Sequence, residues 1–167
     1  MYFINRKSRT LILLLSIYWL NGFSQGKDNL EVISFISENH NFLVRNKTIS
    51  NAYLKRYEIN FEELNFWNPC KQKFEADKAF LNKEEWEALN SEFQKLKKQR
   101  LPNKILKVSN KKNSTSHRIT SITLPILFRD NTYAVYYFEQ RYGGEINLLK
   151  KEKGEWKRYC SYIVWIE

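Results

Sequence analysis

Residues 133–166 read YAVYYFEQRYGGEINLLKKEKGEWKRYCSYIVWI, a stretch rich in β-branched and aromatic residues that glycine interrupts twice. The first part, Tyr133–Gln140, is apolar at consecutive positions. Such a pattern predicts a strand in the middle of a sheet, with both of its faces covered. Gly143-Gly144 and Lys153-Gly154 supply residues that tight hairpin turns favour. The chain is therefore predicted to double back at both points.

The segment before this stretch extends the same sheet. Residues 119–128 (ITSITLPILF) alternate like a strand, and Pro125 predicts an edge position or a bulge within it. Residues 129–131 (RDN) supply a turn, and the returning strands are predicted over 146–151 and 156–166. Together these segments predict an antiparallel meander of roughly four strands.

The clearest helical pattern lies upstream, over residues 83–98. Asn82 and Glu85 are spaced as a capping box. The apolar residues of this segment recur at helical spacing and share one face, namely Trp86, Leu89, Phe93 and Leu96. Pro102 marks the stop.

Two further segments precede that helix. Residues 29–40 predict a short amphipathic helix, whereas residues 42–76 are dense in aromatic residues but follow neither helical nor strand periodicity. Asn68-Pro69 is predicted to break any regular element there. The fold class predicted from the whole chain is α+β, with N-terminal helices packed on the antiparallel meander.

The N-terminus has the three parts of a secretory signal peptide. Basic residues at positions 6, 7 and 9 precede an apolar run over residues 10–20, and Gly22 and Ser24 provide small residues before a cut at Gln25. The apolar run has 11 residues, whereas a membrane-spanning helix needs about 20. An uncleaved anchor remains the alternative. The prediction is export to the periplasm or the extracellular space.

Length and composition fit this organisation. The chain has 167 residues, 43% of them hydrophobic, with five Gly, three Pro and two Cys. A real core is therefore expected, and collagen-like, low-complexity and disulfide-dense classes are excluded. We expect a signal peptide over residues 1–24 and a single α+β domain over residues 25–167, with no transmembrane segment in the mature chain. The sequence does not indicate an oligomeric state.

The formal charge of +10 is concentrated in one segment: residues 93–129 contain ten Lys or Arg and no Asp or Glu. One interpretation is an anion-binding stripe, and the other is a solvated helix end and loop. The partner of such a stripe would be an anionic glycan or lipid surface, or a protein. Nucleic acid is disfavoured because no aromatic residue interleaves with the cations. The candidate anion-binding residues are Lys95, Lys97, Lys98, Arg100, Lys104, Lys107, Lys111, Lys112 and Arg118.

Cys70 and Cys160 are the only cysteines. In an oxidising compartment they could form a disulfide, which would close a loop of about 90 residues and stabilise the fold by about 4 kcal/mol in the chain-entropy model. Two separate buried thiols are the alternative, since sequence alone does not give the distance between them.

Motifs that carry chemistry are missing from the chain. It contains no HExxH, CxxC, EF-hand, GxSxG, P-loop or GxGxxG pattern. Glu62-Glu63 and Glu84-Glu85 are adjacent pairs, whereas a glycosidase needs two carboxyl groups that face one cleft. No metal site and no cofactor are predicted. The leading hypothesis is a non-catalytic exported binding module, and the alternative is an envelope hydrolase or transferase that uses carboxylates.

The C-terminal half also resembles a set of small exported bacterial proteins of unassigned function that end in an antiparallel strand meander. The resemblance rests on Leu124–Phe128 (LPILF), Tyr142-Gly143-Gly144, the Lys153–Lys157 segment (KGEWK) and the terminal Trp165-Ile166, with a further likeness at Phe80–Glu85 (FLNKEE). It covers about half of the mature chain. It implies a fold and an export route rather than an activity.

Overall fold

The computed structural model describes residues 27–39, 43–55, 58–102 and 119–167. The predicted signal peptide and its cleavage position lie outside these ranges. So do five of the candidate basic residues, Lys104, Lys107, Lys111, Lys112 and Arg118.

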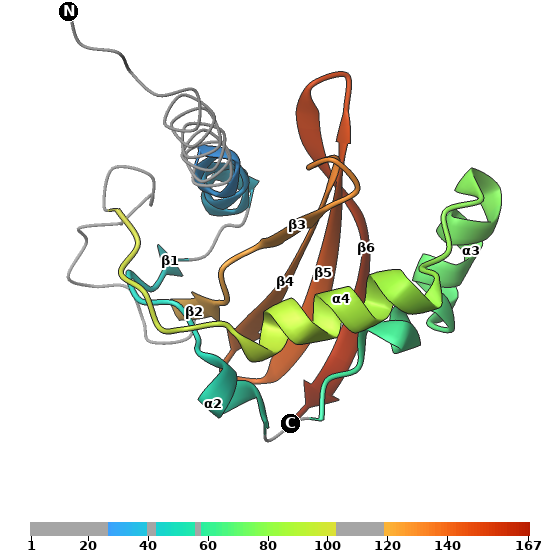
Figure 1. Cartoon of the computed structure of the whole chain (residues 1–167). Helices are drawn as coiled ribbons and strands as arrows, with labels where there is room; N and C mark the ends of the chain where they lie inside the picture. Colours follow the sequence, from blue (N-terminus) through green and yellow to red (C-terminus); the bar gives the residue numbers. More distant parts are fainter. Residues whose placement is uncertain (1–26, 40–42, 56–57, 103–118) are drawn as a thin grey trace, which may run out of the picture.

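Helices occupy the N-terminal half and an antiparallel sheet the C-terminal half, which confirms the predicted α+β class (Figure 1). Residues 27–39 are helical, close to the predicted 29–40. The elements that follow are β1 (Leu43–Val44), α2 (Asn51–Leu54), the 3-10 helix η2 (Phe61–Asn65), α3 (Asn68–Asp77), α4 (Lys83–Gln94), β2 (Ile119–Ile122), β3 (Ile126–Phe128), β4 (Tyr133–Gln140), β5 (Gly143–Glu152) and β6 (Glu155–Ile166).

The sheet has the strand order β1-β2-β4-β5-β6, and β3 pairs with β4 alongside β2. Strands β2 to β6 pair antiparallel, whereas the two-residue β1 runs parallel to β2. The described sheet therefore exceeds the predicted four strands. The extra strands come from β1 and from the division of the predicted 119–128 strand into β2 and β3.

That division is a bulge. Ile122 pairs with Phe138 and Ile126 pairs with Val135, so the three residues 123–125 face only two residues of β4. Pro125 cannot donate a ladder hydrogen bond. The extra residue therefore falls where proline already interrupts the pairing, in agreement with its predicted place at an edge or a bulge.

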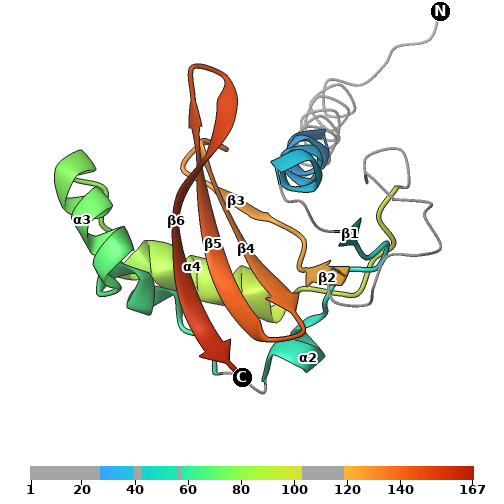
Figure 2. The ribbon, with the colours of Figure 1, turned by 180° about the vertical axis from the view of Figure 1, so that it is seen from behind.

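Strand β4 lies in the middle of the sheet and is buried on both faces. Tyr133, Val135 and Tyr137 pack into a core that also receives residues of α3 and α4. The alternate residues pack into a second core that receives the helix over residues 27–39, and they are Ala134, Tyr136 and Phe138. Helix α4 crosses in front of the strands in Figure 1 and lies behind them in Figure 2.

Helix α4 begins as predicted and ends earlier than predicted. The Glu85 amide donates to Asn82 Oδ1 at 2.9 Å and the Asn82 amide donates to Glu85 Oε2 at 3.1 Å, which completes the capping box. The helix stops at Gln94 rather than at residue 98. Asn51 of α2 accounts for this end, because its side-chain amide donates to the Gln94 carbonyl at 2.7 Å and its backbone N–H donates to the Leu96 carbonyl at 2.9 Å.

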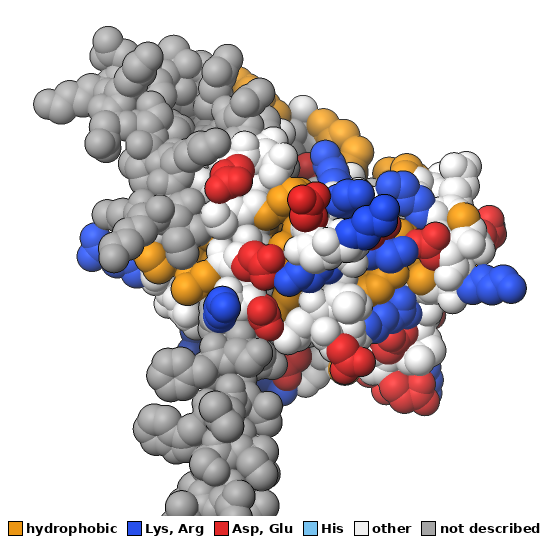
Figure 3. All heavy atoms as spheres, turned by 90° about the horizontal axis from the view of Figure 1, so that it is seen from above, with side chains coloured by type: hydrophobic (Ala, Val, Ile, Leu, Met, Phe, Trp, Pro, Cys, Tyr) orange, Lys and Arg blue, Asp and Glu red, His pale blue; other side chains and the backbone are white. Residues whose placement is uncertain are grey.

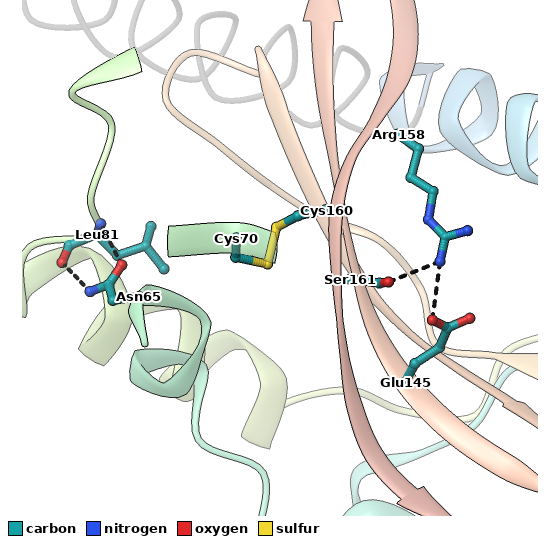
Figure 4. The surroundings of a disulfide bond; sticks show 7 residues. All are labelled: Asn65, Cys70, Leu81, Glu145, Arg158, Cys160 and Ser161. Carbon is teal, nitrogen blue, oxygen red and sulfur yellow. Dashed lines mark hydrogen bonds and ion pairs between the residues drawn. A yellow bond between two sulfur atoms is a disulfide. The ribbon is translucent and has the colours of Figure 1, made fainter. Parts of the chain in front are cut away.

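The segment over residues 58–81 contains α3, which packs against the sheet. Pro69 lies in the first turn of α3 instead of breaking it, because a first-turn N–H has no helical partner to lose. Asn65 fixes the far end of this segment, since its side chain donates to the Leu81 carbonyl at 2.8 Å and accepts from the Leu81 amide at 3.0 Å (Figure 4).

A disulfide joins Cys70 of α3 to Cys160 of β6, with their Cα atoms 5.2 Å apart (Figure 4). Of the two arrangements that the sequence left open, the structure has the paired one. Both cysteines are buried. Within the described residues, no helix combines the length and the apolar character that crossing a bilayer requires.

Candidate anion-binding site

Two segments of the chain lie side by side next to β2, residues 45–49 and residues 96–101, and together we call them the basic strap. The first segment is fixed to the sheet, because the backbone N–H groups of Arg45 and Ile49 each donate to a carbonyl of β2 at 2.8 Å. The second segment follows directly from the end of α4.

Thr48 holds the two segments together. Its backbone N–H donates to the Gln99 carbonyl at 2.9 Å, and the Gln99 N–H donates back to the Thr48 hydroxyl oxygen at 2.8 Å. The Leu101 N–H donates to the Asn46 carbonyl at 2.8 Å. Thr48 is only 2% exposed. The strap is therefore held by backbone and hydroxyl hydrogen bonds at a buried threonine.

Apolar side chains on the inner side of the strap anchor it to the core. Val44 and Leu101 are buried in the core that the helix over residues 27–39 covers. Because these side chains point inward, the charged residues of the strap are left on the surface. Its cations are all exposed, and they are Arg45, Lys47, Lys97, Lys98 and Arg100.

Two of these cations face each other directly. Lys47 and Arg100 form an antiparallel bridge, which sets their Cα atoms about 4.5–5.5 Å apart. Like charges in directly opposed positions destabilise the pairing. Neither side chain has a carboxylate within 4.0 Å among the described residues, and the same holds for Arg45, Lys97 and Lys98.

The structure divides the predicted stripe. Lys97, Lys98 and Arg100 lie together on the strap, whereas Lys95 is the C-cap of α4 and pairs with Glu92 at 2.7 Å. Arg45 and Lys47 belong to the same surface but were not predicted, because they are about 50 residues away in the sequence. The signal that could have found them is weak: two cations flank Asn46 within the segment of uncertain periodicity.

A second group of cations lies at the end of the molecule that carries the β5–β6 hairpin, and we call Arg129, Lys150 and Lys151 the hairpin-end cations. Figure 3 looks down on this end and shows Lys and Arg side chains interspersed with acidic and hydrophobic ones. Lys151 donates to Glu31 at 2.9 Å, and its ammonium lies 5.4 Å from the Trp156 ring centre.

Arg129 is the most constrained of the three. Its Nε and Nη2 donate to the two carboxylate oxygens of Glu85 at 2.6 and 2.8 Å, and it also donates to the backbone carbonyls of Ala79 and Phe80 at 3.0 Å each. Its guanidinium lies 5.1 Å from the Tyr133 ring centre. The hydrogen bonds from Arg129 lower the pKa of Glu85 below its ordinary value.

Lys150 makes a similar set of contacts. It pairs with Asp77 of α3 at 2.5 Å and lies over the rings of Tyr133 and Tyr159 at 5.9 and 5.3 Å. The hydrogen bond from Lys150 lowers the pKa of Asp77, and burial together with the Asp77 charge raises the pKa of the Tyr159 phenol. Each of the hairpin-end cations therefore has a carboxylate partner within the fold.

A small cavity of about 280 Å³ lies between α2 and the C-terminal end of α4, and its lining includes Lys55, Glu58 and Phe93. Glu58 is the only carboxylate among the described residues that line it, whereas a hydrolase that uses two carboxylates needs both in one cleft. Across the described ranges, no three His, Cys, Asp or Glu residues gather as a metal site would require.

No family model, curated protein or solved structure matches this chain. The resemblance to small exported proteins therefore stays a prediction. The geometry of the molecule itself carries the functional proposal.

Proposed function

We propose that this protein is a non-catalytic exported binding module whose basic strap binds an anionic component of the cell envelope. One observation carries the proposal: Lys47 and Arg100 are held opposite each other with no described carboxylate beside either. Arg45, Lys97 and Lys98 are exposed on the same two paired segments.

An anionic ligand would relieve this repulsion. A sulfate, phosphate or carboxylate group placed between two cations adds two attractive interactions that outweigh the repulsion between the cations. The backbone that carries the cations is already fixed by the hydrogen bonds of Thr48. Binding therefore costs little additional conformational entropy of the backbone. The strap segments contain no aromatic side chain, which favours glycans or lipid head groups over single-stranded nucleic acid.

Chromatography on immobilised heparin tests this proposal with two charge-matched variants of the secreted protein. Lys47→Gln/Lys98→Gln/Arg100→Gln removes three cations from the strap. Lys71→Gln/Lys83→Gln/Lys153→Gln removes three exposed cations elsewhere. We expect the strap variant to bind about tenfold more weakly and to elute at lower salt, with a much smaller change in the control. Equal losses in the two variants would reduce the interaction to net charge and defeat the proposal.

A second arm separates lipid from glycan. Vesicles of phosphatidylcholine with added phosphatidylglycerol would bind the protein if the ligand is a lipid surface, because each Lys or Arg near an anionic membrane contributes about 1 kcal/mol. Binding to heparin together with no binding to such vesicles would assign the strap to anionic glycans.

Export is the other part of the proposal, and it rests on the N-terminal pattern. Mass spectrometry of the protein recovered outside the cytoplasm is expected to give a chain that starts at Gln25. A recovered chain that still starts near Met1 would favour the uncleaved anchor.

A further inference from the structure

The helix over residues 27–39 packs on the face of the sheet that α3 and α4 leave free. Its apolar residues Val32, Ile33 and Ile36 are buried in the second core, against the face of β4 that carries Tyr136. This helix lies apart from α3 and α4 in Figure 1 and in Figure 2. Because different helices pack on the two faces of the sheet, the two packings can be compared.

Buried polar side chains without a partner gather on the face that this helix covers. Asn147 is 0% exposed, and both polar atoms of its side-chain amide lack a hydrogen-bond partner. Thr120 is also 0% exposed, and its hydroxyl lacks a partner. Asn147 pairs with Tyr136 and Thr120 pairs with Val44, and both of these partners belong to the second core. Paired residues of neighbouring strands share a face of the sheet, so Asn147 and Thr120 lie on the second-core side.

The second core contains two more atoms of this kind. They are Oδ1 of Asn29 on the helix and Nε1 of Trp156 on β6. Among the described residues, the first core has a single one, the Tyr159 hydroxyl. A buried donor or acceptor that lacks a protein partner has lost its bonds to water without replacement. The free-energy cost of burial therefore falls mainly on the packing of the helix over residues 27–39.

The connections that hold the two layers of helices also differ. A disulfide joins α3 to β6, and Arg129 joins the sheet to α4 through two hydrogen bonds to one carboxylate. Side-chain contacts hold the helix over residues 27–39 to the strand turns: Lys151 donates to Glu31 at 2.9 Å, and the Asn131 amide donates to Asp28 at 2.9 Å. The Lys151 pair is exposed, and exposed ion pairs contribute little to stability.

We propose that the helix over residues 27–39 is a detachable cover, which leaves the sheet as a unit while the rest of the fold stays intact. Detachment exposes Val32, Ile33 and Ile36 to water, which opposes it. It also returns the unpartnered amide of Asn147 to water, together with the other polar atoms of the second core, which favours it. Such a balance produces opening of one element at a lower free energy than global unfolding.

The cover also regulates how firmly the basic strap is anchored. Val44 and Leu101, which hold the strap to the core, belong to the same hydrophobic cluster as the apolar residues of the helix. When the helix leaves, these two anchors lose their cover and the strap cations lose their fixed positions. This regulation rests on the proposed function of the strap. The detachment does not, because it is measured without any ligand.

Native-state hydrogen exchange of the secreted protein, resolved amide by amide, tests the detachment. We expect the amides of the helix over residues 27–39 to be at least about tenfold less protected than those of α4. The opening free energies are expected to be nearly equal along the helix, because it leaves as a unit. Protection equal to that of α4, or a gradual decrease from one end of the helix to the other, would overturn the proposal.

Two matched double variants identify the cause. Thr120→Val/Asn147→Val removes polar groups that lack partners, and we expect it to increase protection of the helix about tenfold. Asn65→Val/Thr123→Val makes the same two exchanges where the side chains have hydrogen-bond partners, and we expect no increase. If this control does not fold, Thr123→Val alone replaces it. No increase in the first variant, or an equal increase in the control, would overturn the proposal.

The Leu101 amide reports on the strap in the same experiment. It donates to the Asn46 carbonyl across the strap, and we expect its protection to increase together with that of the helix in Thr120→Val/Asn147→Val. Protection that increases in the helix and stays unchanged at Leu101 would overturn the regulation of the strap. The heparin experiment would then still stand as the test of the strap itself.

Discussion

The hairpin-end cations and the strap cations have the same chemistry and opposite surroundings. Arg129, Lys150 and Lys151 each lie against a carboxylate and over an aromatic ring. On the strap, Lys47 faces Arg100, and neither has a described acid beside it. A count of basic residues along the sequence does not separate these two groups. Their partners do, and the difference supports the proposal that the first group stabilises the fold and the second binds an anionic ligand.

The largest expected change in stability follows from removing the disulfide, which fixes α3 to β6. Helix α3 carries Asp77, the carboxylate that pairs with Lys150. Cys70→Ala/Cys160→Ala opens a loop of 90 residues and is expected to lower the free energy of unfolding by about 4 kcal/mol. Urea denaturation measures this loss. Heparin retention of the folded variant is expected to stay unchanged, because the disulfide does not touch the strap. A loss of retention without unfolding would couple the two regions and contradict the comparison.

Arg129 and Arg45 give the most direct contrast in stability. Arg129→Met is expected to lower the free energy of unfolding by about 2–3 kcal/mol, because it removes four charge-assisted hydrogen bonds and leaves Glu85 half-buried without its cation. Arg45→Met removes an exposed cation that is unpaired among the described residues and is expected to change it by less than about 0.5 kcal/mol. Thermal or urea unfolding compares the two. Similar losses would show that pairing does not separate the regions.

Thr48 tests what holds the strap itself. Thr48→Val keeps the shape of the side chain and removes the oxygen that accepts from the Gln99 N–H. The expected cost is about 1–1.5 kcal/mol in unfolding free energy. Hydrogen exchange of the strap amides should accelerate more than that of β4. An equal change in amide exchange rates in the strap and in β4 would show that the Thr48 hydroxyl does not hold the two strap segments together.

The pH dependence of stability should follow Glu85. Its folded pKa lies below the ordinary value of 4.5 because Arg129 hydrogen-bonds the charged form. The resulting stability is fully present above pH 4.5 and is lost as the pH falls through the folded pKa. Glu85→Gln keeps the capping geometry and removes the charge. Urea midpoints measured between pH 7 and pH 3 should fall less in this variant than in the natural chain. Parallel curves would contradict the pairing.

Local patterns in the sequence predicted much of the sheet. Two-sided burial of β4 follows from an unbroken apolar run, and the hairpins follow from their turn residues. Pro125 marked the interruption, but the division into two strands depends on register against β4, which is not visible locally. Pro69 is compatible with both a break and a helix start, and packing of α3 decided for the latter.

The strap was only half predictable, because its two segments meet over about 50 residues of intervening chain. A charge run identifies Lys97, Lys98 and Arg100, whereas Arg45 and Lys47 join them through backbone pairing at Thr48. The partner of Arg129 was likewise hidden, because Glu85 lies 44 residues away in the sequence. The partner of Lys95 was not hidden, because Glu92 and Lys95 are three residues apart at the end of one helical pattern.

Amide chemical-shift mapping with a heparin tetrasaccharide tests the central claim most directly, because one spectrum reports on both groups of cations. The account predicts that shifts at increasing ligand concentration concentrate on residues 45–47 and 97–100. It also predicts that Arg129, Lys150 and Lys151 stay at their positions. Shifts centred on the hairpin-end cations, with the strap unchanged, would contradict it.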